Sequence, residues 1–232
     1  MSYTVYCIMM VFLVACFISC RFLQNGKGAL FSKTMASLGF VVGAILSLGF
    51  GYSYAGLYIV IGLICGMLGD IFIELRKEYK QESLMYFNSG MASFALGHVM
   101  YILAMLRAVS DSHIKLNIWI DIMIPVGVAI IFSCLIFFVL AKPMKLDFGK
   151  CKWQSFCYSI ELTFAMMLSV MLFINHKFPI LLMIGLISFL LSDLVLSMQF
   201  FGGEEKEDNK LLVAINHILY YGAQILIAGV LF

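Results

Sequence analysis

The segment GLYIVIGLICGMLGDIFIEL, residues 56–75, is an apolar run long enough to cross a lipid bilayer, yet it contains two carboxylates. A hydrocarbon core about 30 Å thick requires about 20 apolar residues in a helix. Asp70 lies in the interior of the run, and Glu74 follows one helical turn later. A charged carboxylate in the middle of a span costs about 2.5–3.5 kcal/mol on insertion scales, so its presence needs a reason.

The composition of the whole chain agrees with this membrane character. The chain has 232 residues, of which 63% are hydrophobic and only 12% are charged, whereas soluble domains average about 25% charged residues. We therefore predict an all-α, polytopic membrane protein that forms a single membrane domain over 1–232. Eight apolar runs have the length of a transmembrane helix, at about 3–20, 34–51, 56–75, 85–106, 117–140, 153–174, 178–201 and 211–232.

The distribution of basic residues predicts the orientation of these spans, because cytoplasmic loops carry an excess of Lys and Arg. Of the 15 Lys and Arg residues, 12 lie on the side of the loops that follow spans one, three, five and seven. We therefore expect both termini outside, in the cell membrane if the protein is bacterial. The first span has no basic residue before Arg21, unlike a cleavable signal peptide, so we expect it to be retained.

Several functional classes are disfavoured by the sequence. A net charge of +2 without a basic cluster does not indicate nucleic-acid binding. The cysteines form no CxxC pair and the four histidines are scattered, so we expect no disulfide framework, no metal site and no cofactor. The chain has no G-x-S-x-G, H-E-x-x-H or Walker motif. It also lacks the G-x-G-D motif of intramembrane aspartyl proteases, because Met67 replaces the first glycine.

A short motif recurs in the two halves of the chain. GLICGMLGDIFIEL (62–75) and GLISFLLSDLVLSM (185–198) both follow the pattern G-L-I-x-x-x-L-x-D. We therefore predict two pseudo-symmetric halves of four helices, 1–110 and 111–232, arranged as parallel repeats like the halves of some transporters. Chance similarity between two apolar segments is the alternative explanation.

Asp70 and Asp193, one in each copy of the motif, are the strongest candidates for catalytic residues. Intramembrane carboxylates usually face the interior of a helix bundle and mark a site, although they also serve as hydrogen-bonded links between helices. If the repeat is real, the two aspartates lie at equivalent depths and approach a common axis. We expect Glu74, near the cytoplasmic end, and Asp121, near the outer boundary, to be solvated.

The fourth span, MYFNSGMASFALGHVMYILAM (85–105), carries polar side chains on one helical face. His98 and Tyr101 share this face with Gly90 and Phe94, and Asn88 lies near the cytoplasmic end. A single intramembrane histidine is often only a hydrogen-bonded packing residue. Its polar neighbours and the preceding Asp70 span favour a role in a site.

The last span contains a second polar series, in NHILYYGAQILIAG (216–229). His217, Tyr220 or Tyr221, and Gln224 recur at helical spacing, and tyrosine and glutamine can both donate and accept hydrogen bonds. A third intramembrane carboxylate, Glu161 in CYSIELTF, is expected to pair with His98 or His217, and its role is left open.

The ordered motifs in spans three, four, seven and eight resemble the YhhN-type lysoplasmalogenase family, which are eight-span membrane hydrolases. The resemblance covers nearly the whole chain and rests on GLICGMLGD (62–70), FNSGMASFALGHVMY (87–101), LISFLLSDLVL (186–196) and YYGAQ (220–224). The family also tends to carry Lys-Pro at the start of span two. Here Thr34 follows Lys33, so that element is only half matched.

The resemblance implies hydrolysis of the vinyl ether bond of a lysoplasmalogen to a fatty aldehyde and a glycerophospho-alcohol, with Asp70 and Asp193 as the catalytic groups. Protonation of the β-carbon of a vinyl ether gives an oxocarbenium ion, which water captures. Burial and a second nearby carboxylate both favour a protonated carboxylic acid. One aspartate would donate the proton, and the other, ionised, would stabilise the cation and activate the water. The sequence does not assign these two roles.

The other polar candidates are expected to bind the lysophospholipid and the attacking water. Lys33, predicted at the cytoplasmic start of span two, is expected to meet the phosphate, although lysines are common at such positions for reasons of topology. The residues expected to place the head group and the water are Asn88, His98, Tyr101, Tyr220, Tyr221 and Gln224.

The main alternative function is a proton-coupled transporter of a small or lipid-like solute. Parallel repeats together with intramembrane Asp, Glu and His residues also suit a proton relay. Against transport, no span is clearly broken at its midplane, since Pro125 lies towards the outside of span five. A structural scaffold protein is a weaker alternative, because it would not need two matched buried aspartates.

Overall fold

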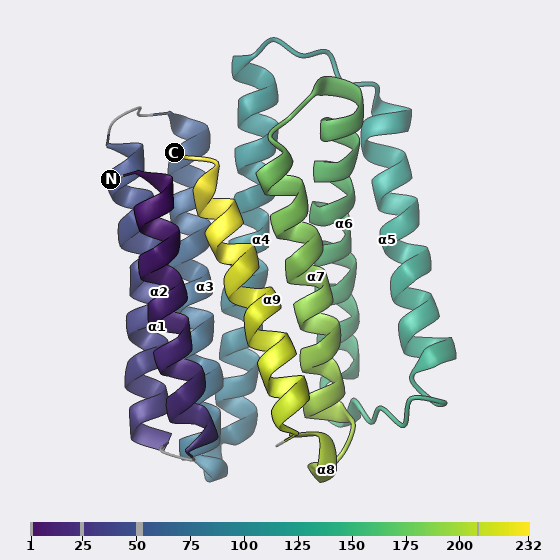
Figure 1. The fold of residues 1–232 in the computed structure, drawn as a ribbon. Coiled ribbons are helices and arrows are strands. Elements are labelled where there is room, and N and C mark those ends of the chain that lie inside the picture. Colours follow the sequence, from purple (N-terminus) through teal and green to yellow (C-terminus); the bar gives the residue numbers. More distant parts are fainter. Residues whose placement is uncertain (1, 24–25, 50–52, 208) are drawn as a thin grey trace. The chain divides into compact units, whose positions relative to one another are not determined.

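In the computed structural model, the described residues are 2–23, 26–49, 53–207 and 209–232, and they form helices joined by short connections (Figure 1). Among these residues, eight helices are long and apolar enough to cross a membrane, which confirms the predicted all-α membrane fold. The chain packs as two compact units, and each is described by itself. Unit 1 comprises Met1–Ala108 and Gln224–Phe232, and unit 2 comprises Val109–Ala223. A repeat relationship between the halves stays a prediction.

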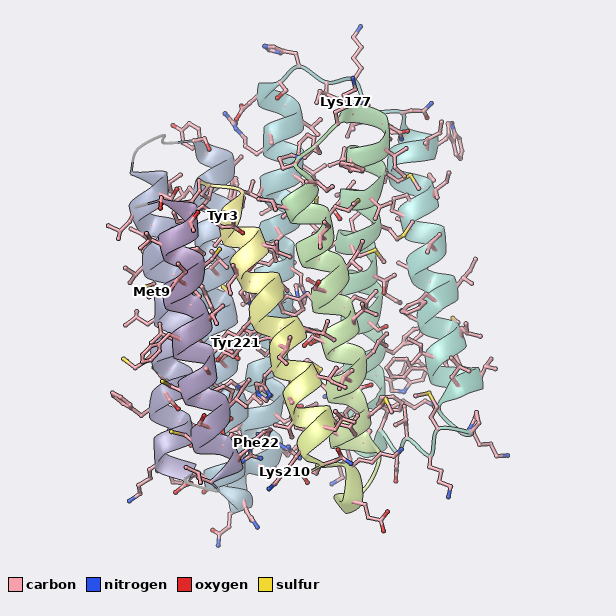
Figure 2. The ribbon with its side chains drawn as sticks, viewed as in Figure 1. Tyr3, Met9, Phe22, Lys177, Lys210 and Tyr221 are labelled. Carbon is pink, nitrogen blue, oxygen red and sulfur yellow. The ribbon has the colours of Figure 1, made fainter. Side chains whose placement is uncertain are left out.

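Unit 1 is built from the first four long helices and the last residues of the chain. Helix α2 packs against α1 on one side and α3 on the other. Tyr3 and Phe22 mark the two ends of α1 in Figure 2. The helical elements are α1 (Tyr3–Phe22), α2 (Gly26–Leu48), α3 (Tyr54–Glu78), the short η1 (Lys80–Glu82) and α4 (Ser83–Asp111), whose final turn belongs to unit 2.

Helices α3 and α4 approach closely because glycines stand where they meet. A Cβ atom added to Gly62 would lie 2.4 Å from the ring of Tyr101 and 3.0 Å from the carbonyl oxygen of Gly97. A Cβ atom added to Gly69 would lie 2.7 Å from the ring of Phe94. Small residues let transmembrane helices pack backbone against backbone. The polar face predicted for α4 therefore lies against α3 at Phe94 and Tyr101.

The two ends of the chain meet within unit 1. The rings of Tyr3 and Phe232 lie 5.4 Å apart, and the Tyr6 ring stacks on Phe232 at 5.0 Å. The Ser47 hydroxyl of α2 donates a hydrogen bond to the carbonyl oxygen of Leu231. Leu231 and Phe232, which follow α9, are therefore part of the same packed core as α1 and α2.

Unit 2 contains the remaining elements, except that the last turns of α9, residues 224–229, belong to unit 1. Helix α6 packs against both α5 and α7. Two π-helical stretches flank α5, and Lys177 turns the chain between α6 and α7 with a positive φ of 56° (Figure 2). The elements are η2 (Ile118–Met123), α5 (Ile124–Cys134), η3 (Leu135–Leu140), η4 (Gly149–Cys151), α6 (Lys152–His176), α7 (Ile180–Phe201), α8 (Glu204–Glu207) and α9 (Lys210–Gly229).

The start of the second span differs from the prediction by more than two helical turns. The second span was predicted to begin at 34, but α2 begins eight residues earlier, at Gly26. Within these added turns, Lys33 pairs with Asp70, and the Ser32 hydroxyl donates a hydrogen bond to the carbonyl oxygen of Gly28. The predicted end of that span, at 51, lies outside the described residues. The acidic segment 202–210 includes the short helix α8.

The glycine contact between α3 and α4 predicts that Gly62→Ala destabilises the protein. The added methyl group would meet the Tyr101 ring and the α4 backbone, and overpacking of this kind typically costs about 1–3 kcal/mol. Thermal unfolding in detergent should show a lower midpoint for this variant. Gly127→Ala is the matched control, because a Cβ atom there meets nothing within 4 Å. An equal effect of the two substitutions would contradict the proposed close packing.

Candidate functional site

Asp70 is a buried carboxylate whose partners come from the neighbouring helix α2. Its side chain is 2% exposed. The Ser37 hydroxyl donates a hydrogen bond of 2.6 Å to its Oδ2 atom, and the Lys33 ammonium nitrogen lies 3.4 Å from its Oδ1 atom. Ser37 and Lys33 are four residues apart on α2, so both side chains lie on one helical face. A cation and a hydroxyl donor are the partners that an ionised carboxylate requires.

The ammonium group of Lys33 is shared between Asp70 and Glu74. Its Nζ atom lies 3.6 Å from Oε2 of Glu74, which is also 3.6 Å from Nζ of Lys77. The Oε1 atom of Glu74 lies 4.0 Å from a guanidinium nitrogen of Arg21, at the end of α1. We call these five residues the ion-pair network. It joins α1, α2 and α3 in unit 1.

The network corrects two expectations. Glu74 was predicted to be solvated at the end of its span, but it is 3% exposed, because three basic side chains surround it and replace the solvent. Lys33 was predicted at the very start of span two, but it is the eighth residue of α2 and is 4% exposed. Its ammonium is also 5.7 Å from the centre of the Phe17 ring. Its predicted contact with a phosphate stays untested.

The polar candidates of α4 and the end of α9 also lie in unit 1. The Tyr101 hydroxyl donates a hydrogen bond of 3.2 Å to Oε1 of Gln224, and both side chains are buried. His98 is fully buried, with its ring centre 6.4 Å from that of Tyr101. Asn88 is partly exposed. The structure therefore joins Tyr101 to Gln224, two residues that were predicted as candidates from separate motifs.

Asp193 lies on α7 in unit 2 and is partly buried. It accepts a short hydrogen bond from the Tyr158 hydroxyl of α6. The preceding residue, Ser192, exchanges hydrogen bonds with Asn216 of α9, including one of 2.9 Å from the Asn216 side chain to the Ser192 carbonyl oxygen. Each aspartate of the recurring motif is therefore bonded to the preceding helix of its own unit, Asp70 to α2 and Asp193 to α6.

The remaining candidates of α9 form an aromatic row within unit 2. His217 donates from Nδ1 to the carbonyl oxygen of Val213 at 2.7 Å, and its ring stacks at 6.5 Å on Tyr221. Tyr220 meets the Phe189 ring of α7 edge-on at 5.5 Å. Glu161 lies within electrostatic range of the Tyr158 hydroxyl. The predicted pairing of Glu161 with a histidine stays a prediction.

Asp121 was expected to be solvated, and the structure corrects this. The side chain is 1% exposed and accepts hydrogen bonds from the backbone N–H of Asn117 at 2.8 Å and from the Asn175 amide at 2.7 Å. Nε2 of His176 donates to the same carboxylate at 3.1 Å. The C-terminal end of α6 covers Asp121, so this carboxylate joins α6 to η2.

Four residues that contact the candidate residues were not identified from the sequence. Ser37 and Tyr158 each bond to one of the two aspartates, and Arg21 and Lys77 complete the ion-pair network. The spacing of Ser37 from Lys33 was a usable signal, as was the position of Tyr158 three residues before Glu161. Arg21 and Lys77 looked like ordinary positive-inside residues.

The shared ammonium predicts a large effect of Lys33→Met. Removing it leaves Asp70 and Glu74 buried without this partner, and breaking a buried ion pair on one side costs about 3–5 kcal/mol. Chemical or thermal unfolding in detergent should show this loss, whereas Lys142→Met, at an exposed position, should change stability by less than about 0.5 kcal/mol. Adding Asp70→Asn to Lys33→Met should cost less than the sum of the single effects. Strict additivity would contradict the pairing.

Comparison with known proteins gives one result. No curated protein and no solved structure matches the chain. The profile of the YhhN family, however, matches residues 28–231, a range that includes Lys33, both aspartates and every α4 and α9 candidate. This chain belongs to the YhhN family.

Proposed function

We propose that this protein is an intramembrane hydrolase that cleaves the vinyl ether bond of lysoplasmalogens. One observation carries the proposal: in a member of the YhhN family, Asp70 is buried within a membrane span and is held by Ser37 and Lys33. Placing a carboxylate and a cation inside a membrane span costs free energy. Ionisable groups within membrane spans therefore generally mark a functional site. Water and the lipid are the only reactants, and no cofactor is invoked.

The partners of Asp70 support different catalytic roles for the two aspartates. Lys33 and Ser37 favour the ionised form of Asp70, which suits it to stabilise a cation and to accept a proton from water. The role of proton donor then falls to Asp193. Its hydrogen bond from Tyr158 fixes the orientation of the carboxyl group.

The proposed reaction proceeds in three steps. Asp193 transfers a proton to the β-carbon of the alkenyl group, and the resulting oxocarbenium ion is stabilised by ionised Asp70. Water adds to the α-carbon and loses a proton to Asp70, which gives a hemiacetal. The hemiacetal then breaks its bond to the glycerol oxygen, which takes the proton from Asp70, while the hemiacetal hydroxyl gives its proton to Asp193. This releases the fatty aldehyde and the glycerophospho-alcohol and restores both aspartates. Asn88, His98, Tyr101, Tyr220, Tyr221 and Gln224 would place the head group and the water.

The proposal predicts that Asp70→Asn and Asp193→Asn each abolish hydrolysis. Loss of an acid or base typically lowers the rate by about 10²–10⁴-fold. The measurement is release of fatty aldehyde from a lysoplasmalogen by purified protein in detergent. Asp147→Asn, at an exposed loop position, is the matched control and should leave the rate unchanged. Unaltered aldehyde release in both test variants would rule out the assignment. Proton-dependent uptake into vesicles without any hydrolysis would instead favour a transporter.

Tyr158→Phe tests the positioning of Asp193. Loss of the phenolic hydroxyl removes the hydrogen bond to the carboxyl group but keeps the ring. We expect kcat to fall by up to about tenfold while KM changes little, because a single hydrogen bond contributes about 0.5–1.5 kcal/mol. Tyr86→Phe, on α4 in unit 1, should leave kcat unchanged. A rise of KM with constant kcat would assign Tyr158 to substrate binding instead.

A further inference from the structure

The ion-pair network ends in two basic side chains that are partly exposed. Asp70, Lys33 and Glu74 are almost fully buried, but the side chains of Arg21 and Lys77 are 17% and 20% exposed. Both contact the same carboxylate, Glu74, from two different helices. Glu74 therefore holds a guanidinium and an ammonium close together at the edge of unit 1 where α1 and α3 end.

The surroundings of Lys77 are rich in positive charge. Its ammonium shares the Glu74 carboxylate with Arg21 and Lys33, and Arg76 precedes it in the chain. Arg76 is directed towards α4, where its guanidinium lies 5.8 Å from the centre of the Phe87 ring. An additional anion beside Lys77 and Arg21 would therefore reduce the repulsion among these cations. Arg and Lys are the side chains that bind phosphate groups most effectively.

We infer that Arg21 and Lys77 form a binding site for the phosphate of the lysophospholipid substrate. The inference rests on the proposed function and deepens it, because it names the part of the substrate that this end of unit 1 recognises. Phosphate oxygens replace water on the exposed side of the two cations, while Glu74 keeps the cations in place from the buried side. Lys33 is buried with Asp70 and Glu74, so it pairs with these carboxylates and does not bind the phosphate.

The length of the substrate agrees with this placement. Lys77 follows Asp70 by seven residues, or about 10 Å along a helix, and its ammonium folds back to Glu74, which is only about 6 Å beyond Asp70 along the axis. In a lysoplasmalogen, seven bonds separate the β-carbon of the vinyl ether from phosphorus, and an extended chain of seven bonds spans about 8 Å. A phosphate at Arg21 and Lys77 therefore allows the vinyl ether to reach the level of Asp70.

Binding of lipids that cannot be hydrolysed tests the site independently of catalysis. The probes are a 1-O-alkyl lysophosphatidylethanolamine and the matching 1-O-alkylglycerol, which lacks the phosphate, titrated against purified protein in detergent. The wild type should bind the phosphate-bearing lipid at least about tenfold more tightly, as expected for charge-assisted hydrogen bonds. The double variant Arg21→Gln/Lys77→Gln should lose this preference and keep its affinity for the alkylglycerol.

Three controls make the outcomes distinct. Lys142→Gln/Lys150→Gln removes two positive charges from exposed positions and should retain the preference. Arg21→Lys/Lys77→Arg should also retain it, which separates loss of charge from misfolding when unfolding midpoints are compared. Inorganic phosphate at physiological concentration should not displace the lipid.

Two results would overturn the inference. These are a wild type without preference for the phosphate, or a folded Gln double variant that keeps the preference. Displacement of the lipid by inorganic phosphate would assign the site to free phosphate instead. Failure of the proposed hydrolysis would be seen separately, as absence of aldehyde release by a wild type that still shows the binding preference.

Discussion

The ammonium group of Lys33, shared by Asp70 and Glu74, is the interaction on which the organisation of unit 1 depends. Each of these three groups alone would be strongly unfavourable inside a membrane span. The ammonium offsets one of the two negative charges, and Arg21 and Lys77 offset the charge of Glu74 from its other sides. Because Lys33 comes from α2 and both carboxylates come from α3, the pairing fixes how these helices face each other. On another face of α3, Gly62 and Gly69 pack directly against the aromatic rings of Tyr101 and Phe94 of α4. Helix α3 therefore contacts α2 through ion pairs and α4 through close packing.

The two aspartates of the recurring motif occupy different environments. Asp70 is buried with a cation and a hydroxyl group, whereas Asp193 is partly buried and bonded to a phenol. Acid–base catalysis by two carboxylates requires that one is protonated while the other is ionised, and different surroundings are the usual means of separating them.

The sequence was sufficient to predict the eight spans and the family, but not the pairing of the charges. Apolar runs of about 20 residues are a local property, and the bilayer accepts few other structures. The exposure of Glu74 and Asp121 was predicted wrongly. A carboxylate near the end of a span is expected to contact water when its partners on other helices are not known. Their partners, on α1 and α2 for Glu74 and on α6 for Asp121, become visible only after the helices pack. Tyr158 was overlooked for the same reason.

The membership of Gln224–Phe232 in unit 1 has a consequence for biosynthesis. Ribosomes deliver the chain from its N-terminus, and domains generally fold in the order in which they emerge. Here the partners of Tyr101, Ser47 and Tyr3 are made last, after all of unit 2 has been translated. The first four helices therefore insert into the membrane before their core can be completed. Termination of translation before Gln224 would therefore leave the core of the first four helices incomplete.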